Sequence, residues 1–230
     1  MTRIGVVVFP GSNCEHDAAS AMRELGADVD FVWHTETDLA SFDGLVLPGG
    51  FAHGDYLRPG ALARFSPVMS AVADFAAAGG RVLGICNGFQ VLTEAGLLPG
   101  ALQKNRGLTF ISQPTTVIVA STRSTLTRAA TVGQRLVIPI NHFSGAYTCD
   151  DETFDRLEAG DQIVLRYETN PNGSRGDVAG IANEAGNVVG LMPHPERAMS
   201  TLLGSGDGRI LLAGFLGAYA LAGARDVGAL

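Results

Sequence analysis

The cysteine best placed to act as a nucleophile lies where a buried strand meets a helix. Cys86 stands between Gly84 and Gly88, directly after the apolar run 82–85. Gly-x-Cys-x-Gly at a strand-to-helix turn is the nucleophile-elbow arrangement, with sulfur in place of the serine oxygen. The N–H groups that open the following helix favour a thiolate, and the N–H of Asn87 can face an oxyanion on a substrate. We therefore predict that Cys86 is a catalytic nucleophile rather than a structural core cysteine.

The other two cysteines fit this role less well. Cys14 follows the apolar run 4–9 and the turn 10–13, but it lacks flanking glycines and is a minor rival. Cys149 lies in a polar turn. Three widely spaced cysteines without a Cys-x-x-Cys pair argue against a zinc site or a disulfide framework. We expect no metal site, reduced thiols and a cytoplasmic location.

A nucleophilic thiol needs a base, and the best candidate is His194 in the Met-Pro-His-Pro-Glu-Arg segment 192–197. The prolines on either side of it are expected to hold the chain extended, so that side chains two positions apart face the same way. Glu196 can then bond the far ring nitrogen and fix its tautomer. A proline-stiffened surface turn explains this segment equally well on its own. The elbow on the same chain favours a triad of Cys86, His194 and Glu196.

A second oxyanion donor is expected in the Pro-Gly-Gly-Phe segment 48–51. Paired glycines after a buried strand can expose backbone N–H groups, here at Gly50 or Phe51. An ordinary glycine-rich turn is the alternative, and it fits this segment better when the segment is taken alone. The glycine-rich segment 204–208 lacks the lysine of a phosphate-binding loop. The sequence therefore shows residues that could cleave an amide but no ATP site.

Alternating strands and helices are predicted to position these residues. Apolar runs predict strands at 4–9, 28–33, 43–47 and 81–85, and helical spacing predicts helices at 18–25, 59–78 and 89–95. Residues 108–190 are rich in Val, Ile, Thr and Tyr and predict added antiparallel strands and hairpins, with turns at 172–173 and 185–187. A buried helix over 210–221 closes the chain, with Ile210, Leu211, Phe215 and Tyr219 facing inward.

These elements predict an α/β fold. We expect one domain over 1–230, with an open mixed sheet, largely parallel, and helices on both faces. Asn13 is expected to cap the first helix and Asp207 the last. Hydrophobic residues make up 46% of the chain and charged residues 17%, which suits a buried core. A net charge of −7 without a basic run argues against nucleic-acid binding, and the last apolar stretch is too short to span a bilayer.

The motifs resemble those of a known family. The segment 84–90 (Gly-Ile-Cys-Asn-Gly-Phe-Gln) together with His194-Pro-Glu196 resembles the class I (triad) glutamine amidotransferases. Further segments are similar to the small, separately encoded glutaminase subunits that serve purine biosynthesis. These are 9–14, 48–51, 54–58, 166–167, 170–174 and 192–197. The resemblance covers essentially the whole chain.

The resemblance implies a flavodoxin-like fold and a set of roles. Cys86 would be the nucleophile, His194 the base and acid, and Glu196 the residue that orients it. Gly50 and Asn87 correspond to the oxyanion-hole region, and Gln90 to a position that holds glutamine. The implied reaction releases glutamate and ammonia. The implied partners are a large synthetase subunit and a small accessory subunit. ATP and Mg²⁺ are expected on the synthetase, which converts formylglycinamide ribonucleotide to formylglycinamidine ribonucleotide, and no cofactor is expected in this chain.

Two segments stay without an assigned role, and two other functions compete. This chain has His-Phe-Ser-Gly at 142–145 where the family often has His-Gly-Glu-Gly. The segment 170–174 is either a contact with the synthetase or a simple turn. A thiol hydrolase or chaperone-like protein of the same shape would lack the distal His-Pro-Glu. A binding module that has lost its chemistry would not keep Cys86, His194 and Glu196 together.

Overall fold

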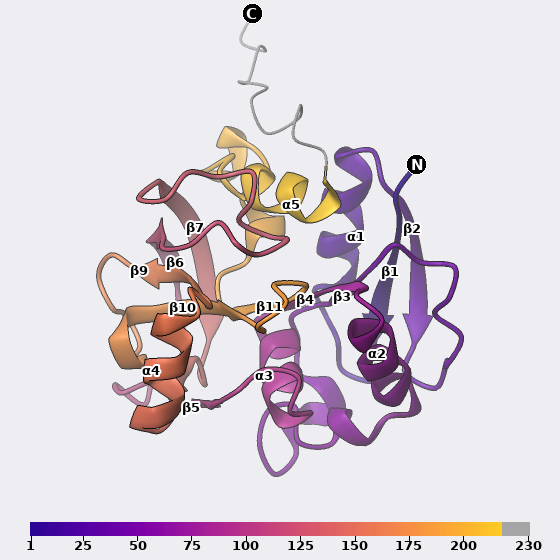
Figure 1. The fold of residues 1–230 in the computed structure, drawn as a ribbon, viewed down its shortest axis with the longest axis horizontal. Coiled ribbons are helices and arrows are strands. Elements are labelled where there is room, and N and C mark those ends of the chain that lie inside the picture. Colours follow the sequence, from indigo (N-terminus) through magenta and orange to yellow (C-terminus); the bar gives the residue numbers. More distant parts are fainter. Residues whose placement is uncertain (218–230) are drawn as a thin grey trace, which may run out of the picture.

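The computed structural model describes residues 1–217, which are built around one nine-stranded sheet (Figure 1). The strand order is β2-β1-β3-β4-β11-β10-β9-β6-β7. The first five strands of this order are parallel to one another, and the pairings from β11–β10 onward are antiparallel. The strands are β1 (Arg3–Val8), β2 (Asp28–Trp33), β3 (Gly44–Leu47), β4 (Arg81–Ile85), β6 (Ile111–Val119), β7 (Arg135–His142), β9 (Ile163–Tyr167), β10 (Val178–Ala182) and β11 (Val188–Leu191).

Helices cover both faces of this sheet, as predicted. In Figure 1, α1 (Glu15–Glu24) and α5 (Gly208–Leu216) lie above the sheet, and α2 (Pro67–Ala77), α3 (Asn87–Glu94) and α4 (Asp151–Ala159) lie below it. Because the centre is covered on both sides, every residue of β3 and β11 is buried. The short strands β5 (Ala101–Gln103) and β8 (Ala146–Thr148) form a separate pair. The predicted α/β fold with a mixed sheet is confirmed.

The register of β4 and β11 positions the predicted site. Ile85, the last residue of β4, pairs with Leu191, the last residue of β11. The N–H of Cys86 donates to the carbonyl of Leu191 at 2.8 Å. Since the two strands are parallel, the segments that follow them leave the sheet at the same edge. The elbow and the segment 192–197 are therefore neighbours.

The helix predicted over 59–78 is wrong in its first half. The structure has a short 3₁₀ helix at Ala63–Phe65 and then α2, which starts at Pro67. Ser66 between them is extended, with φ −63° and ψ 140°. A proline disfavours helical backbone in the residue before it, so Pro67 starts a helix but cannot continue one.

The region 108–190 contains a helix, α4, that the predicted run of strands missed. The Asp150 carboxylate accepts the N–H of Thr153 at 2.7 Å and caps α4. The caps predicted at Asn13 and Asp207 are absent, because each side chain has another partner. Asn13 accepts the thiol of Cys14, and Asp207 accepts the N–H of Val137 at 2.7 Å.

The remaining predictions about the second half have mixed outcomes. The turn at 185–187 joins antiparallel β10 and β11 as expected. Residues 172–173 lie instead in the long connection between β9 and β10, which contains a 3₁₀ helix at Arg175–Asp177. The closing helix is present as far as Leu216, and Tyr219 lies outside the described residues. Within residues 1–217, no helix is long and apolar enough to cross a membrane.

Candidate active site

The backbone at Cys86 is strained as an elbow requires. Cys86 has φ 50° and ψ −103°, a conformation that residues with a side chain rarely adopt. A Cβ on Gly88 would lie 1.9 Å from the carbonyl oxygen of Leu47, and a Cβ on Gly84 would lie 2.7 Å from that of Gly88. Only glycine fits at these two positions, because the backbones of β3, β4 and α3 are in direct contact and leave no room for a side chain.

His194 and Glu196 form a buried pair. Nδ1 of His194 lies 2.6 Å from Oε1 of Glu196, and the two residues are 1% and 5% exposed. The N–H of His194 donates to the carbonyl of Pro139 at 2.8 Å, which fixes its backbone to β7. Burial disfavours the charged imidazole, but the Glu196 carboxylate and Cys86 outweigh burial and raise the pKa of His194.

The local backbone of this pair differs from the prediction. Residues Pro195–Arg197 form a 3₁₀ turn rather than an extended segment. Proline is well suited to the first position of a helical turn, where its missing N–H is not needed. The expected contact between His194 and Glu196 forms all the same.

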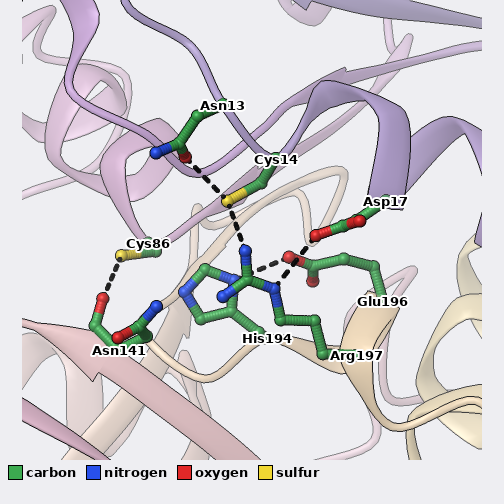
Figure 2. A network of polar contacts seen from close by, with 8 residues as sticks. All are labelled: Asn13, Cys14, Asp17, Cys86, Asn141, His194, Glu196 and Arg197. Atoms are coloured by element: carbon green, nitrogen blue, oxygen red, sulfur yellow. Dashed lines mark hydrogen bonds and ion pairs between the residues drawn. The ribbon is translucent and has the colours of Figure 1, made fainter.

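The thiol of Cys86 hydrogen-bonds to a backbone carbonyl rather than to the imidazole. Its Sγ lies 3.6 Å from the carbonyl oxygen of Asn141, and Figure 2 shows His194 beside this contact. Nε2 of His194 is buried and has no hydrogen-bond partner among the described residues. Cys86 is close enough to contribute to the raised pKa of His194, because a thiolate there would stabilise the charged imidazole.

Cys14 also lies beside the histidine–glutamate pair. The ligand atoms of Cys14, His194 and Glu196 lie within 4.8 Å of one another (Figure 2). Nη2 of Arg197 donates to the Cys14 sulfur at 3.1 Å, so a cation would meet a guanidinium here. Burial and the Glu196 carboxylate raise the pKa of Cys14 to about 12. A thiol with so high a pKa is a poor nucleophile, which argues against Cys14 as the reactive cysteine.

The two sulfurs open into one cavity at the carboxyl ends of the central strands. Its volume is about 370 Å³. The residues that line it and were predicted from the sequence are Gly50, Phe51, Cys86, Gln90 and His194. Lining residues that the sequence did not single out for a role at the site are Asn13, Asp55, Leu57, Arg58, Pro59, Leu102, Lys104, Phe110, Asn141, His142, Phe143, Ser144 and Arg197. Several of these stood in segments that the sequence analysis named, but no local pattern gave them a role. They are Asn13 in 9–14, Asp55, Leu57 and Arg58 in 54–58, His142, Phe143 and Ser144 in 142–145, and Arg197 in 192–197.

The two predicted donors in segment 48–51 are not equivalent. The N–H of Phe51 donates to the carbonyl of Gly11 at 2.9 Å and is therefore occupied. Gly50 lines the cavity, has φ 147°, and is the better placed of the two. The N–H of Asn87 belongs to the first turn of α3, where backbone donors have no partner within the helix.

The side chains of Asn87 and Gln90 connect the walls of the cavity. Asn87 accepts the N–H of Ala52 at 3.0 Å and donates to Oε1 of Gln90 at 2.9 Å. Gln90 donates in turn to the carbonyl of Ser144 at 2.5 Å. The amides thus link the elbow to the loop after β3 and to the segment 142–145.

The segment 170–174 is part of this scaffold. Asn172 is fully buried and donates to the carbonyl of Gly145 at 2.8 Å, and Ser174 accepts the N–H of Tyr147 at 3.0 Å. Asn105 also holds the segment 142–145, because its side chain donates to the carbonyl of His142 at 2.9 Å. The Asn172 side chain therefore faces the interior of this chain and is not available to a partner.

Several known proteins are similar to this chain in sequence and in structure. The family model of the CobB/CobQ-like glutamine amidotransferase domain matches residues 1–206. The chain is 55% identical over 214 residues to phosphoribosylformylglycinamidine synthase subunit PurQ of Parasynechococcus marenigrum, covering 93% of this chain and 99% of that protein. It is 55% identical to the PurQ of Lacticaseibacillus paracasei, covering 90% and 91%.

A solved structure extends the likeness to the fold. A chain of the structure of PurLQS from Thermotoga maritima superimposes with a TM-score of 0.87 and 41% identity, covering 94% of this chain and 98% of that one. Matches at these identities that cover at least 90% of both chains identify the family. This chain belongs to the CobB/CobQ-like glutamine amidotransferases and, within them, to the PurQ subunits of phosphoribosylformylglycinamidine synthase.

Proposed function

We propose that Cys86, His194 and Glu196 carry out the glutaminase reaction of a phosphoribosylformylglycinamidine synthase. The observation that supports these roles most strongly is the buried His194–Glu196 pair beside the strained Cys86. An imidazole held by a carboxylate at Nδ1 can exchange protons at Nε2, which is the atom without a partner.

The proposed reaction starts when Cys86 rotates its thiol toward His194 and transfers its proton. The thiolate attacks the carboxamide carbon of glutamine, and the N–H groups of Gly50 and Asn87 stabilise the oxyanion. The C–N bond breaks as His194 gives its proton to the departing ammonia, which leaves a glutamyl thioester. His194 then takes a proton from water, which attacks the thioester and releases glutamate and the Cys86 thiol.

The ammonia is used by a partner in this proposal. The partner is a large synthetase subunit that binds ATP and Mg²⁺, and a small accessory subunit completes the complex. The partner converts formylglycinamide ribonucleotide to the amidine in the synthesis of purines, a pathway we place in the cytoplasm. Our proposal keeps the chain as one amidotransferase domain without a metal or cofactor of its own.

The test uses the complex reconstituted from this chain and its synthetase partners. Cys86→Ala is expected to abolish amidine formation from glutamine and to leave formation from ammonium salts unchanged. Cys14→Ala and Cys149→Ala are the matched controls, and both should keep the glutamine-dependent reaction. Glutamine-dependent synthesis that survives in Cys86→Ala would contradict the proposed roles.

A further inference from the structure

One carboxylate stands out among the residues that line the cavity. Among the described residues, Asp55 is the only Asp or Glu in the lining, which also contains Arg58, Lys104 and Arg197. Arg58 is paired with Glu94 at 2.6 Å, and Arg197 with Asp17 at 3.1 Å. Asp55 has no cationic partner within residues 1–217. Its charge is therefore not neutralised by the protein.

Asp55 is held next to the elbow. It is half-buried and has a left-handed backbone, with φ 52°. Its Oδ1 accepts Nδ2 of Asn87 at 3.2 Å, the same amide group that donates to Gln90. Over the described part of the chain, Oδ2 takes no hydrogen bond. Oδ1 is thus fixed beside Asn87, the residue that follows the nucleophile, while Oδ2 is free to bind a ligand.

We propose that Asp55 binds the α-ammonium group of the glutamine substrate. This inference rests on the proposed glutaminase function. The α-ammonium is the one cationic group of glutamine. The α-carbon and two methylene groups separate it from the carboxamide that Cys86 would attack. Asn87 follows Cys86 directly, and its side chain contacts Asp55, so the carboxylate lies one side chain from the elbow. A carboxylate with a free oxygen at that position is a suitable partner for an ammonium group.

The other charges of the cavity fit the same orientation of the substrate. Lys104 is the only lysine of the chain, lies 6.0 Å from the ring centroid of Phe143 and has no ion pair within residues 1–217. It is available for the α-carboxylate. Burial raises the pKa of Asp55 to about 6, although the hydrogen bond from Asn87 opposes this. A ligand cation offsets the cost of that buried charge, so binding of the ammonium is favoured.

The test compares two substrates in the reconstituted complex. One is glutamine and the other is 4-carbamoylbutanoate, which is glutamine without its α-ammonium group. In Asp55→Asn, kcat/KM for glutamine should fall about 10- to 100-fold, because a charged hydrogen bond is lost. The value for 4-carbamoylbutanoate should stay within about twofold of wild type, because this substrate never made that bond. Asn tolerates the left-handed backbone, so the variant is expected to fold.

Asp161→Asn is the matched control. Asp161 also has φ 52° but does not line the cavity, so neither substrate should be affected. An equal fall for both substrates in Asp55→Asn would assign Asp55 a structural role and overturn the inference, and an unchanged value for glutamine would overturn it too. A wild-type complex that releases no glutamate from glutamine would instead overturn the proposed function, and this inference with it.

Discussion

Nδ1 of His194 and Oε1 of Glu196 lie 2.6 Å apart, and both residues are almost completely buried. The carboxylate holds the imidazole in one orientation and favours its charged form. Glu196→Gln keeps the shape but loses the charge. We expect the pKa of His194 to fall and kcat for glutamine hydrolysis to drop by about 10²- to 10⁴-fold, as for an amide in place of the carboxylate of other triads. The measurement is glutamate release by the complex.

Glu168→Gln is the control for this substitution. Glu168 pairs with Arg135 at the surface, away from the cavity, and its loss should leave kcat unchanged. A Glu196→Gln enzyme that hydrolyses glutamine at the wild-type rate would show that the pair does not orient the base.

The backbone strain at Cys86 predicts an unusual order of stabilities. With φ 50° and ψ −103°, any side chain at this position costs about 1–3 kcal/mol. Glycine adopts positive φ freely. Cys86→Gly is therefore expected to be more stable than Cys86→Ala by about 1 kcal/mol, the opposite of the usual order in regular structure. Urea unfolding of the two variants measures the difference, and a more stable alanine variant would refute strain at the elbow.

The close approach of β3 and α3 predicts that Gly88 cannot be replaced. A Cβ at this position would lie 1.9 Å from the Leu47 carbonyl oxygen, which belongs to the backbone and cannot turn aside. Gly88→Ala should lower the free energy of unfolding by at least about 2 kcal/mol. Gly206→Ala is the control, because a Cβ there has open space and its φ is not positive. Equal midpoints in thermal unfolding would contradict the packing described here.

The parts of the site that could be predicted from the sequence depend on short-range signals. The elbow is coded by glycines two residues from Cys86, and Glu196 lies two residues from the histidine that it contacts. Asp55 could not be predicted, because its position depends on a hydrogen bond with Asn87 across 32 residues of chain. The sheet edge at which these segments meet follows from the register of β4 and β11, which no local pattern specifies.

Helix α4 shows a different limit. Its capping signal at Asp150 is local and readable, but it lies within a region whose Val, Ile and Thr content favours strands. The strand-favouring composition of the region therefore led to a prediction of strands in spite of this capping signal. The break at Ser66 is the reverse case, because alanine-rich spacing outweighed the effect of Pro67.

The buried His142 predicts a loss of stability in mild acid. Burial, together with the charge of His194, lowers the pKa of His142 from 6.5 to about 4, and Asn105 lies 3.0 Å from its Nδ1. Between these two pH values the unfolded chain binds a proton that the folded chain does not, so stability falls as the pH is lowered. Between pH 7 and pH 5, wild type should lose about 2 kcal/mol more than His142→Gln. Urea unfolding at both pH values measures this, and equal losses would contradict a neutral buried His142.

The buried amide of Asn172 predicts an effect on substrate binding that is separate from its effect on folding. Asn172 bonds the carbonyl of Gly145, and the segment 142–145 forms one wall of the cavity. Asn172→Ala should lower the free energy of unfolding by about 1–3 kcal/mol, because buried polar groups lose their partner. It should also raise KM for glutamine several-fold, because the wall is no longer held.

Asn187 separates the two effects. It is equally an interior amide, 7% exposed, and it donates to the carbonyls of Ala76 and Gly80 at 2.9 and 2.8 Å, but it precedes β11 at the opposite edge of the sheet. Asn187→Ala should be destabilised to a similar degree and keep the wild-type KM. If both variants raise KM equally, the effect reflects general loss of stability. Weaker binding of the synthetase by Asn172→Ala at an unchanged KM would instead show that the segment 170–174 contacts the partner. Because Asn172 is buried, we expect synthetase binding to be unchanged.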